Sequence, residues 1–180
     1  MRLSRYVLSA LLVLLAGVVN AETSAPDPWS PVRFLLGQWA GSATGQAGDG
    51  SVTRQYEFVL NERFIRESNT STYPAQEKNE HGEVHEHLGF LSYDNARMLV
   101  VLRQFHVEGF VNQYVLSPAS TTATKVVFES EHFENFSNKW RARETYEILN
   151  ANEFIETFEL APPDKPFDTY SKNHFRRVGS

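Results

Sequence analysis

The chain has no cysteine among its 180 residues. Disulfide bonds, thiolate chemistry, cysteine-ligated metals and iron–sulfur clusters are therefore excluded, and the stability of the fold has to come from a buried core. Nucleophile motifs, phosphate-binding loops and dinucleotide-binding fingerprints are also missing. Beyond residue 37 no stretch shows a convincing 3.6-residue period, which argues against a helical fold.

Long hydrophobic runs are scarce as well, and the clearest one lies at the N-terminus. Arg2 and Arg5 precede an apolar run of 14 residues from Tyr6 to Val19, which is short for a membrane span. Val19-Asn20-Ala21 fits the small-x-small pattern of a cleavage site. We therefore predict a secretion signal over residues 1–21 and a periplasmic or secreted protein, with an uncleaved anchor as the alternative.

The remaining chain, residues 22–180, has few basic residues for its acidity. Without Arg2 and Arg5 it carries 15 basic and 22 acidic residues. This balance argues against nucleic acid and against an anionic membrane surface as partners. Its length predicts one domain, with no membrane span once the signal is cleaved. The sequence leaves the oligomeric state open.

Alternation of apolar and polar residues dominates what is present. Between residues 99 and 116, two alternating runs flank a short turn at Val107-Glu108-Gly109. Such a pattern predicts an antiparallel hairpin. One face of it mixes aromatic side chains with Gln, His and Asn, as the inside of a ligand-holding barrel would.

The same pattern recurs along the chain. Strands are predicted over residues 38–45, 51–60, 63–73, 84–93, 97–106, 109–117, 124–133, 140–149, 153–161 and 169–178. Short links between them favour an all-β, ten-stranded, antiparallel up-and-down barrel of the calycin or lipocalin-like type. A short helix after Ser30-Pro31, ending before Gly37, is expected to pack on one end of this barrel.

The segment Phe34-Leu-Leu-Gly-Gln-Trp-Ala-Gly41 resembles the opening of the nitrobindin-like barrels, and Arg176-Arg177 resembles their close. Fatty-acid-binding proteins and, more distantly, lipocalins are related folds. The resemblance implies that Trp39 plugs one end of the barrel. It also implies a haem held by a histidine on the last strand, acting on nitric oxide or peroxynitrite. Aligning the closing arginines puts Tyr170 at the ligand position, with His174 four residues later, on the same predicted face.

A second candidate is a metal site in His81-Gly-Glu-Val-His-Glu-His87. His85 and His87 are two residues apart on a predicted strand, so their imidazoles share a face. Glu83 or His81 could supply a third ligand. The alternative is a solvated strand start beside a polar loop.

Polar side chains on the predicted inner faces are the third candidate. They can anchor a ligand, or hydrogen-bond one another or bound water. Arg66 is the arginine expected to face inward, where it could hold a carboxylate or a haem propionate. The full predicted ligand-binding set is Tyr56, Phe58, Arg66, Gln104, His106, Asn112, Tyr114 and Tyr146.

Three functions follow from these patterns. The first is an exported, lipocalin-like barrel that binds a small, largely apolar or amphipathic molecule in its interior. The second is a haem protein resembling nitrobindin, with Tyr170 or His174 as the iron ligand. Of the three hypotheses, only this one would make the protein an enzyme. The third is a structural envelope protein without a small ligand.

Overall fold

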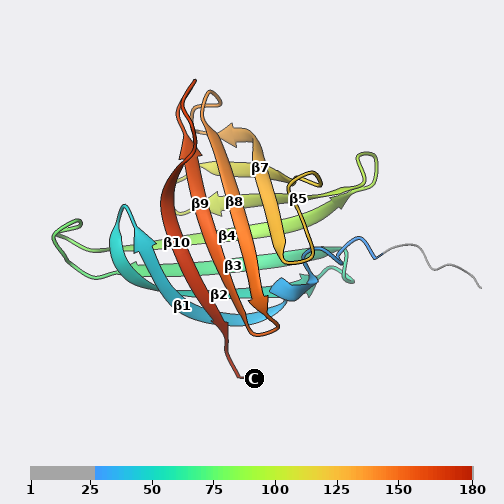
Figure 1. The fold of residues 1–180 in the computed structure, drawn as a ribbon, viewed down its shortest axis with the longest axis horizontal. Coiled ribbons are helices and arrows are strands. Elements are labelled where there is room, and N and C mark those ends of the chain that lie inside the picture. The colour runs from blue at the N-terminus through green and yellow to red at the C-terminus, as the bar shows by residue number, and fades with distance from the viewer. Residues whose placement is uncertain (1–26, 180) are drawn as a thin grey trace, which may run out of the picture.

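The computed structural model describes residues 27–179, so the predicted secretion signal lies outside the described residues. The chain forms ten antiparallel strands in a closed barrel, with neighbours in the order β1-β10-β9-β8-β7-β6-β5-β4-β3-β2 (Figure 1). The elements are η1 (Arg33–Leu35), β1 (Gly37–Gly45), β2 (Gly48–Val59), β3 (Phe64–Tyr73), β4 (Glu83–Asp94), β5 (Leu99–His106), β6 (Val111–Leu116), β7 (Lys125–Glu134), β8 (Arg141–Asn150), β9 (Glu153–Ala161) and β10 (Asp168–Arg177). The predicted up-and-down barrel is confirmed.

Strands β8, β9 and β10 cross in front of β2 to β5 at a steep angle, so the barrel resembles two curved sheets facing each other (Figure 1). The seam between β1 and β10 pairs residues from Trp39↔Arg177 to Gly45↔Ser171. Closure in this way gives each of the ten strands two neighbours, so none is an edge strand. Among residues 27–179, no helix has the length and apolar character needed to cross a membrane.

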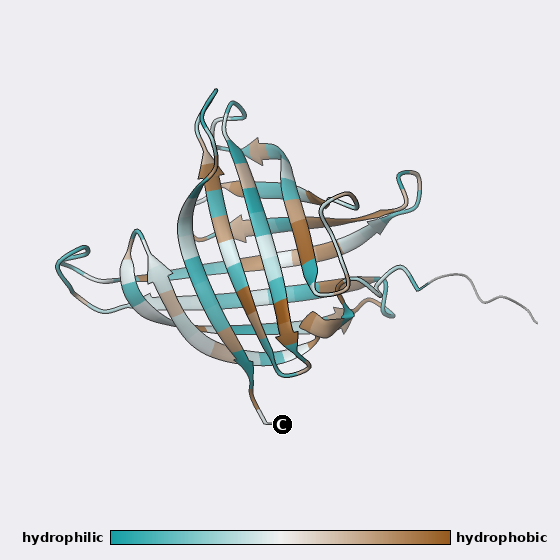
Figure 2. Cartoon of the chain, in the orientation of Figure 1, coloured by the Kyte–Doolittle hydropathy of each residue, from teal (hydrophilic) through white to brown (hydrophobic). Residues whose placement is uncertain are grey.

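One end of the barrel is closed by the segment before β1. The predicted helix is a single 3-10 turn, η1, whose Leu35 is fully buried. Trp39 is buried beneath it and donates its indole N–H to the Leu35 carbonyl at 2.6 Å. Figure 2 shows hydrophobic residues gathered on the ends of β8 and β9 that lie beside η1. Trp39 therefore plugs this end, as the resemblance implied.

The last strand holds η1 in place. The Arg177 guanidinium donates to the Leu36 carbonyl at 2.5 Å and to the Phe34 carbonyl at 3.1 Å. It also stacks over the Trp39 ring, 4.1 Å from its centroid. Because 3-10 turns this short are not stable alone, these contacts fix the plug against the barrel.

A bulge in β10 changes which side chains face inward. Its pairing with β9 shifts between Thr169 and Ser171. After the shift, Asn173 and Phe175 are buried inside the barrel, while His174 is turned to the outer face. The predicted strict alternation of Tyr170 and His174 on one face is therefore wrong, because a β-bulge adds a residue and reverses the register of the faces.

Candidate functional site

The end of the barrel opposite η1 holds a cavity of about 460 Å³. Its mouth is surrounded by the turn between β1 and β2 and by the β3–β4, β5–β6, β7–β8 and β9–β10 turns, which lie at the same end of the barrel. This volume lies within the range of small-molecule sites. The cavity has a polar floor inside the barrel and an aromatic mouth.

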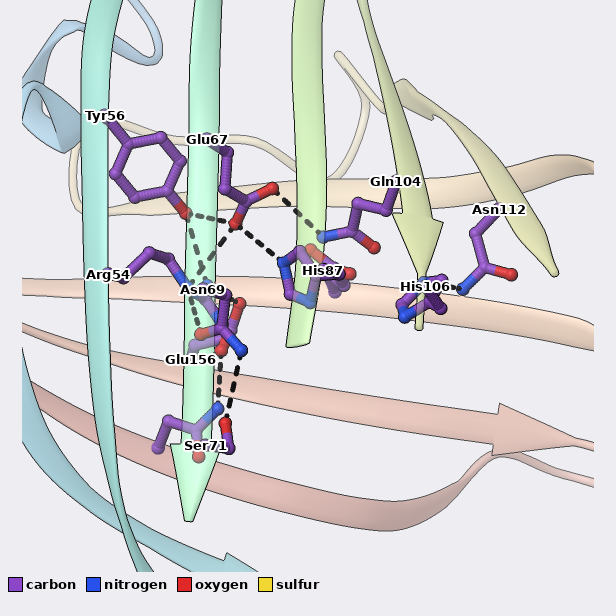
Figure 3. Close-up of polar contacts among 12 residues, drawn as sticks. Arg54, Tyr56, Glu67, Asn69, Ser71, His87, Gln104, His106, Asn112 and Glu156 are labelled. Carbon is purple, nitrogen blue, oxygen red and sulfur yellow. Dashed lines mark hydrogen bonds and ion pairs between the residues drawn. The ribbon is translucent and has the colours of Figure 1, made fainter. Parts of the chain in front are cut away.

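The floor centres on Arg54, which projects inward from β2 and is almost fully buried (Figure 3). Its guanidinium donates to Asn69 Oδ1 at 2.9 Å and to Glu156, and lies 3.4 Å from Glu67 Oε1. The Tyr56 hydroxyl donates to the same Glu67 oxygen at 2.9 Å. Asn173 donates to the second oxygen of Glu156 at 2.7 Å. One guanidinium thus holds two buried carboxylates from opposite sides of the barrel.

Glu67 remains ionised in this setting. Burial alone would raise its pKa, but His87 and Arg54 together with the Tyr56 hydrogen bond lower the pKa of Glu67 to about 2. Space for the carboxylate comes from Gly89 on β4, where a Cβ atom would lie 2.2 Å from Glu67 Oε2. Any side chain at position 89 would displace the carboxylate from the network.

Glu144 on β8 behaves in the opposite way. Burial, followed by repulsion from Glu156 and Glu67, raises the pKa of Glu144 to about 8. Tyr146 donates its hydroxyl to Glu144 Oε2 at 2.6 Å. The lining therefore carries a carboxyl group that retains its proton near neutral pH, beside carboxylates paired with Arg54.

Three histidines meet between the floor and the mouth. His85 and His87 come from β4 and His106 from the end of β5, with ring centroids 5.2 to 5.8 Å apart. Burial, and then electrostatic interaction with His87 and His85, lowers the pKa of His106 to about 3. One nitrogen of each ring lies within 4.8 Å of the corresponding atoms of the other two. The predicted pair His85 and His87 gains a third neighbour in His106, instead of the expected Glu83 or His81.

The mouth combines aromatic rings with acidic groups. Its aromatic side chains include Phe110, Phe133, Phe136, Trp140, Phe158 and Tyr170. Glu83 and Glu108 are the acidic residues that line it. Burial, then Glu83 and Glu108, raise the pKa of the Tyr170 phenol.

Several predicted ligand-binding residues come together here. Gln104, His106, Asn112 and Tyr114 all line the cavity. Asn112 contacts the Tyr114 hydroxyl at 2.9 Å and His106 Nε2 at 3.2 Å, which links the floor to the histidines. The other predicted positions lie elsewhere. Tyr56 and Tyr146 are buried behind the lining, and Phe58 packs at the closed end, 5.9 Å from the Trp29 ring. Contrary to the prediction, none of these three residues lines the cavity.

Arg66 does not face inward. It pairs with Glu57 on the outer surface, and the inward residues of β3 are Ile65, Glu67, Asn69, Ser71 and Tyr73. The prediction was wrong because both faces of β3 carry mostly polar residues, so alternation could not tell the inner face from the outer one and assigned them in reverse. The interior arginine is Arg54, which shares a face with Val52 and Tyr56. A charged residue alternating with those two was the signal that could have identified it.

The two predicted haem ligands, Tyr170 and His174, lie on different faces of the barrel wall. Tyr170 lines the mouth and packs edge-on against Phe158, with centroids 5.8 Å apart. His174 lies on the outer surface, where its Nε2 is 2.7 Å from Glu153 Oε1. An inward-facing His174 is therefore wrong, for the reason given by the β10 bulge.

Comparisons with known proteins bear on the fold. No protein-family model and no curated protein matches the chain. Among solved structures, the crystal structure of Rv2717c from M. tuberculosis matches with a TM-score of 0.60, covering 85% of this chain and 98% of that one. Sequence identity is 16%, so the likeness shows the fold alone. It supports the predicted ten-stranded antiparallel barrel.

Proposed function

We propose that this protein binds a small amphipathic molecule inside the barrel. The ligand's apolar body lies among the aromatic rings of the mouth, and a cationic or hydrogen-bond-donating head group reaches the carboxyl groups of the floor. The observation that carries this proposal is the charge of the cavity wall. Besides the protonated Glu144, its described lining residues include three glutamates, Glu83, Glu108 and Glu156, and one arginine, Arg54.

Arg54 does not balance this charge for a ligand. Its donors are already directed at Asn69, Tyr56 and Glu156, with Glu67 at ion-pair distance. The glutamates at the mouth lie beside aromatic faces, which also attract cations. Electrostatics therefore favour an amine over a carboxylate, and the floor is more polar than the largely apolar ligand expected from sequence would need.

Haem fits this lining poorly. Its propionates would meet Glu83 and Glu108 at the mouth, where the described lining offers no free arginine or lysine. His174 is outside the barrel, and the raised pKa of Tyr170 disfavours the phenolate that binds iron. We therefore derive no haem chemistry for the cavity.

A purely structural role is also less favoured. A barrel that serves only as a scaffold gains stability by filling its interior with apolar side chains, because buried polar groups are costly. Here the closed end follows that rule and the other end keeps an open, polar cavity. The predicted export to the periplasm or exterior stays part of this proposal, as the setting in which such a binder would meet its ligand.

The test uses three probes that share one body and differ in head group: 3-phenylpropylamine, 3-phenylpropan-1-ol and 3-phenylpropionate. Titration of the isotope-labelled protein, followed by amide chemical shifts, measures weak affinities and locates each probe. We expect the amine to bind most tightly and the acid least, with shifts centred on β4 to β8 near the mouth. Equal affinity for the acid, or shifts centred on η1, would overturn the proposal.

Two variants sharpen this test. Glu83→Gln removes one carboxylate of the mouth and is expected to weaken the amine more than the alcohol. Glu129→Gln changes an exposed glutamate of β7 and serves as the matched control, since it leaves the cavity untouched. A loss of amine affinity in the control variant alone would contradict the placement of the amine in the cavity.

A further inference from the structure

We infer that His85, His87 and His106 form a binding site for a divalent transition-metal ion, zinc above all, with its remaining coordination position open to the cavity. This goes beyond the proposed binding of an organic ligand, because it names a second species bound by different residues. Three neutral imidazoles with one open position are a common zinc ligand set.

The spacing of the ring nitrogens fits such a site. His85 Nε2 and His106 Nδ1 lie 3.3 Å apart. Zinc–nitrogen bonds of about 2.0–2.1 Å at tetrahedral angles separate neighbouring nitrogens by about 3.4 Å. Two ligands are thus already placed along one edge of a tetrahedron. The third, from His87, lies within 4.8 Å of both, so a small side-chain rotation completes the set.

His87 supplies an independent sign of a missing partner. Its residue is only 8% exposed, and neither ring nitrogen makes a hydrogen bond. Nε2 lies 3.3 Å from Glu67 Oε1, an ion-pair distance without hydrogen-bond alignment (Figure 3). Buried polar atoms almost always have a partner. A metal ion at Nδ1 would satisfy this ring and leave Nε2–H free to turn toward Glu67.

The residues behind the histidines match the surroundings of metal ligands. His85 Nδ1 contacts the Glu108 carboxylate at 2.8 Å, on the side away from His106. Together with Glu67 behind His87, this gives two carboxylate–histidine pairs, which orient metal-binding rings and raise their basicity.

His106 completes the pattern through Asn112, whose amide lies 3.2 Å from His106 Nε2. A half-turn of the amide would let its oxygen accept hydrogen bonds from His106 Nε2–H and from the Tyr114 hydroxyl. His106 Nδ1 would then be left free to bind metal.

The test is a titration of the purified, chelator-treated protein with zinc chloride by calorimetry, and with cobalt chloride by visible absorption. We expect one ion per chain and the intense cobalt bands of a four-coordinate site. His85→Gln and His106→Gln, both at half-buried positions, are each expected to weaken zinc binding at least tenfold. Glu108→Gln is expected to weaken it about tenfold while leaving all three ligands in place.

Matched controls come from the two histidines His81 and His132, which are exposed and outside the cluster. His81→Gln and His132→Gln are expected to bind zinc as the parent does. The inference is overturned if the parent binds no stoichiometric ion, or if His85→Gln and His106→Gln, shown to be folded by circular dichroism, bind as the parent does. In that case the 3.3 Å contact is a hydrogen bond between two rings.

Discussion

The two ends of the barrel are built from the same ten strands and differ in what they bury. At the closed end, Leu35, Trp39, Phe154 and Phe175 are fully buried and contact one another through rings and aliphatic groups. At the open end, the buried side chains include Arg54, glutamates and amides around a cavity. A strand passes from one environment to the other within a few residues.

The closed end mainly stabilises the fold, whereas the open end is where we place the proposed function. Burial of apolar surface stabilises the closed end, whereas each buried charge at the open end has a desolvation cost that only its partners offset. The buried charges beside the open cavity are the groups that the proposed binding of an amphipathic ligand would use. Matched mutations at the two ends, compared by their effects on stability and on binding, test this view.

The largest expected effect is at the closed end. The Phe154 ring packs 4.6 Å from Trp39 and 4.8 Å from Phe175, measured between centroids. Phe154→Ala removes these contacts and leaves a void, so the free energy of unfolding should fall by about 4 kcal/mol. Urea denaturation measures this loss.

Its counterpart is Phe136→Ala at the mouth, where the side chain is 45% exposed. We expect a loss of stability below about 1 kcal/mol, together with weaker binding of 3-phenylpropylamine. Equal destabilisation by the two variants would mean that the mouth is part of the stabilising core, and would break the comparison.

A second prediction concerns the charged floor. Arg54→Met leaves Glu67 and Glu156 buried without their shared cation, and should cost about 3 kcal/mol at pH 7. Arg66→Met removes the exposed partner of Glu57 and should cost less than about 1 kcal/mol. Both are measured by urea denaturation. Similar losses from the two arginines would show that the buried pairs add nothing beyond surface pairs.

Much of the fold was predictable from sequence, because alternation is strong in most strands. The turn at residues 107–109, the ten strands and the plug residue Trp39 all follow from local pattern or from the opening motif. Alternation mispredicted the inward-facing residues where buried side chains are polar or where a strand is not regular. It assigned β3 in reverse because Glu67, Asn69 and Ser71 are polar yet buried, and it misplaced His174 because the bulge in β10 carries no sequence signal that we recognised.

The site was harder to predict than the fold, since it depends on pairing between distant strands. His85 and His87 share a face by spacing alone, but His106 joins them through the β4–β5 register, His87↔His106. Likewise, Arg54 meets Glu156 across the barrel, 102 residues apart in sequence. Such contacts exist only once the barrel closes, so no window of the sequence contains them.

The last prediction concerns the pH dependence of stability that Glu144 gives to the floor. The folded-state pKa of Glu144, about 8, exceeds its ordinary value of 4.5. Between these values the folded protein keeps a proton that the unfolded chain has lost, so stability falls as pH rises from about 4.5 to 8, by at most about 1.4 kcal/mol per unit. Glu144→Gln lacks this slope, and its stability relative to the parent should therefore increase from pH 5 to pH 8 in urea denaturation.

Glu67 provides an internal control for the same experiment. Its pKa is lowered from 4.5 to about 2, so its contribution is present above pH 4.5 and is lost as pH falls toward 2. Glu144→Gln keeps the pair between Glu67 and Arg54. The variant and the parent should therefore lose stability alike as the pH falls below 4.5, and differ only between about pH 4.5 and pH 8. Parallel curves from pH 5 to pH 8 would show that Glu144 is ionised in the folded protein, and that the floor carries one more negative charge for a cationic ligand to meet.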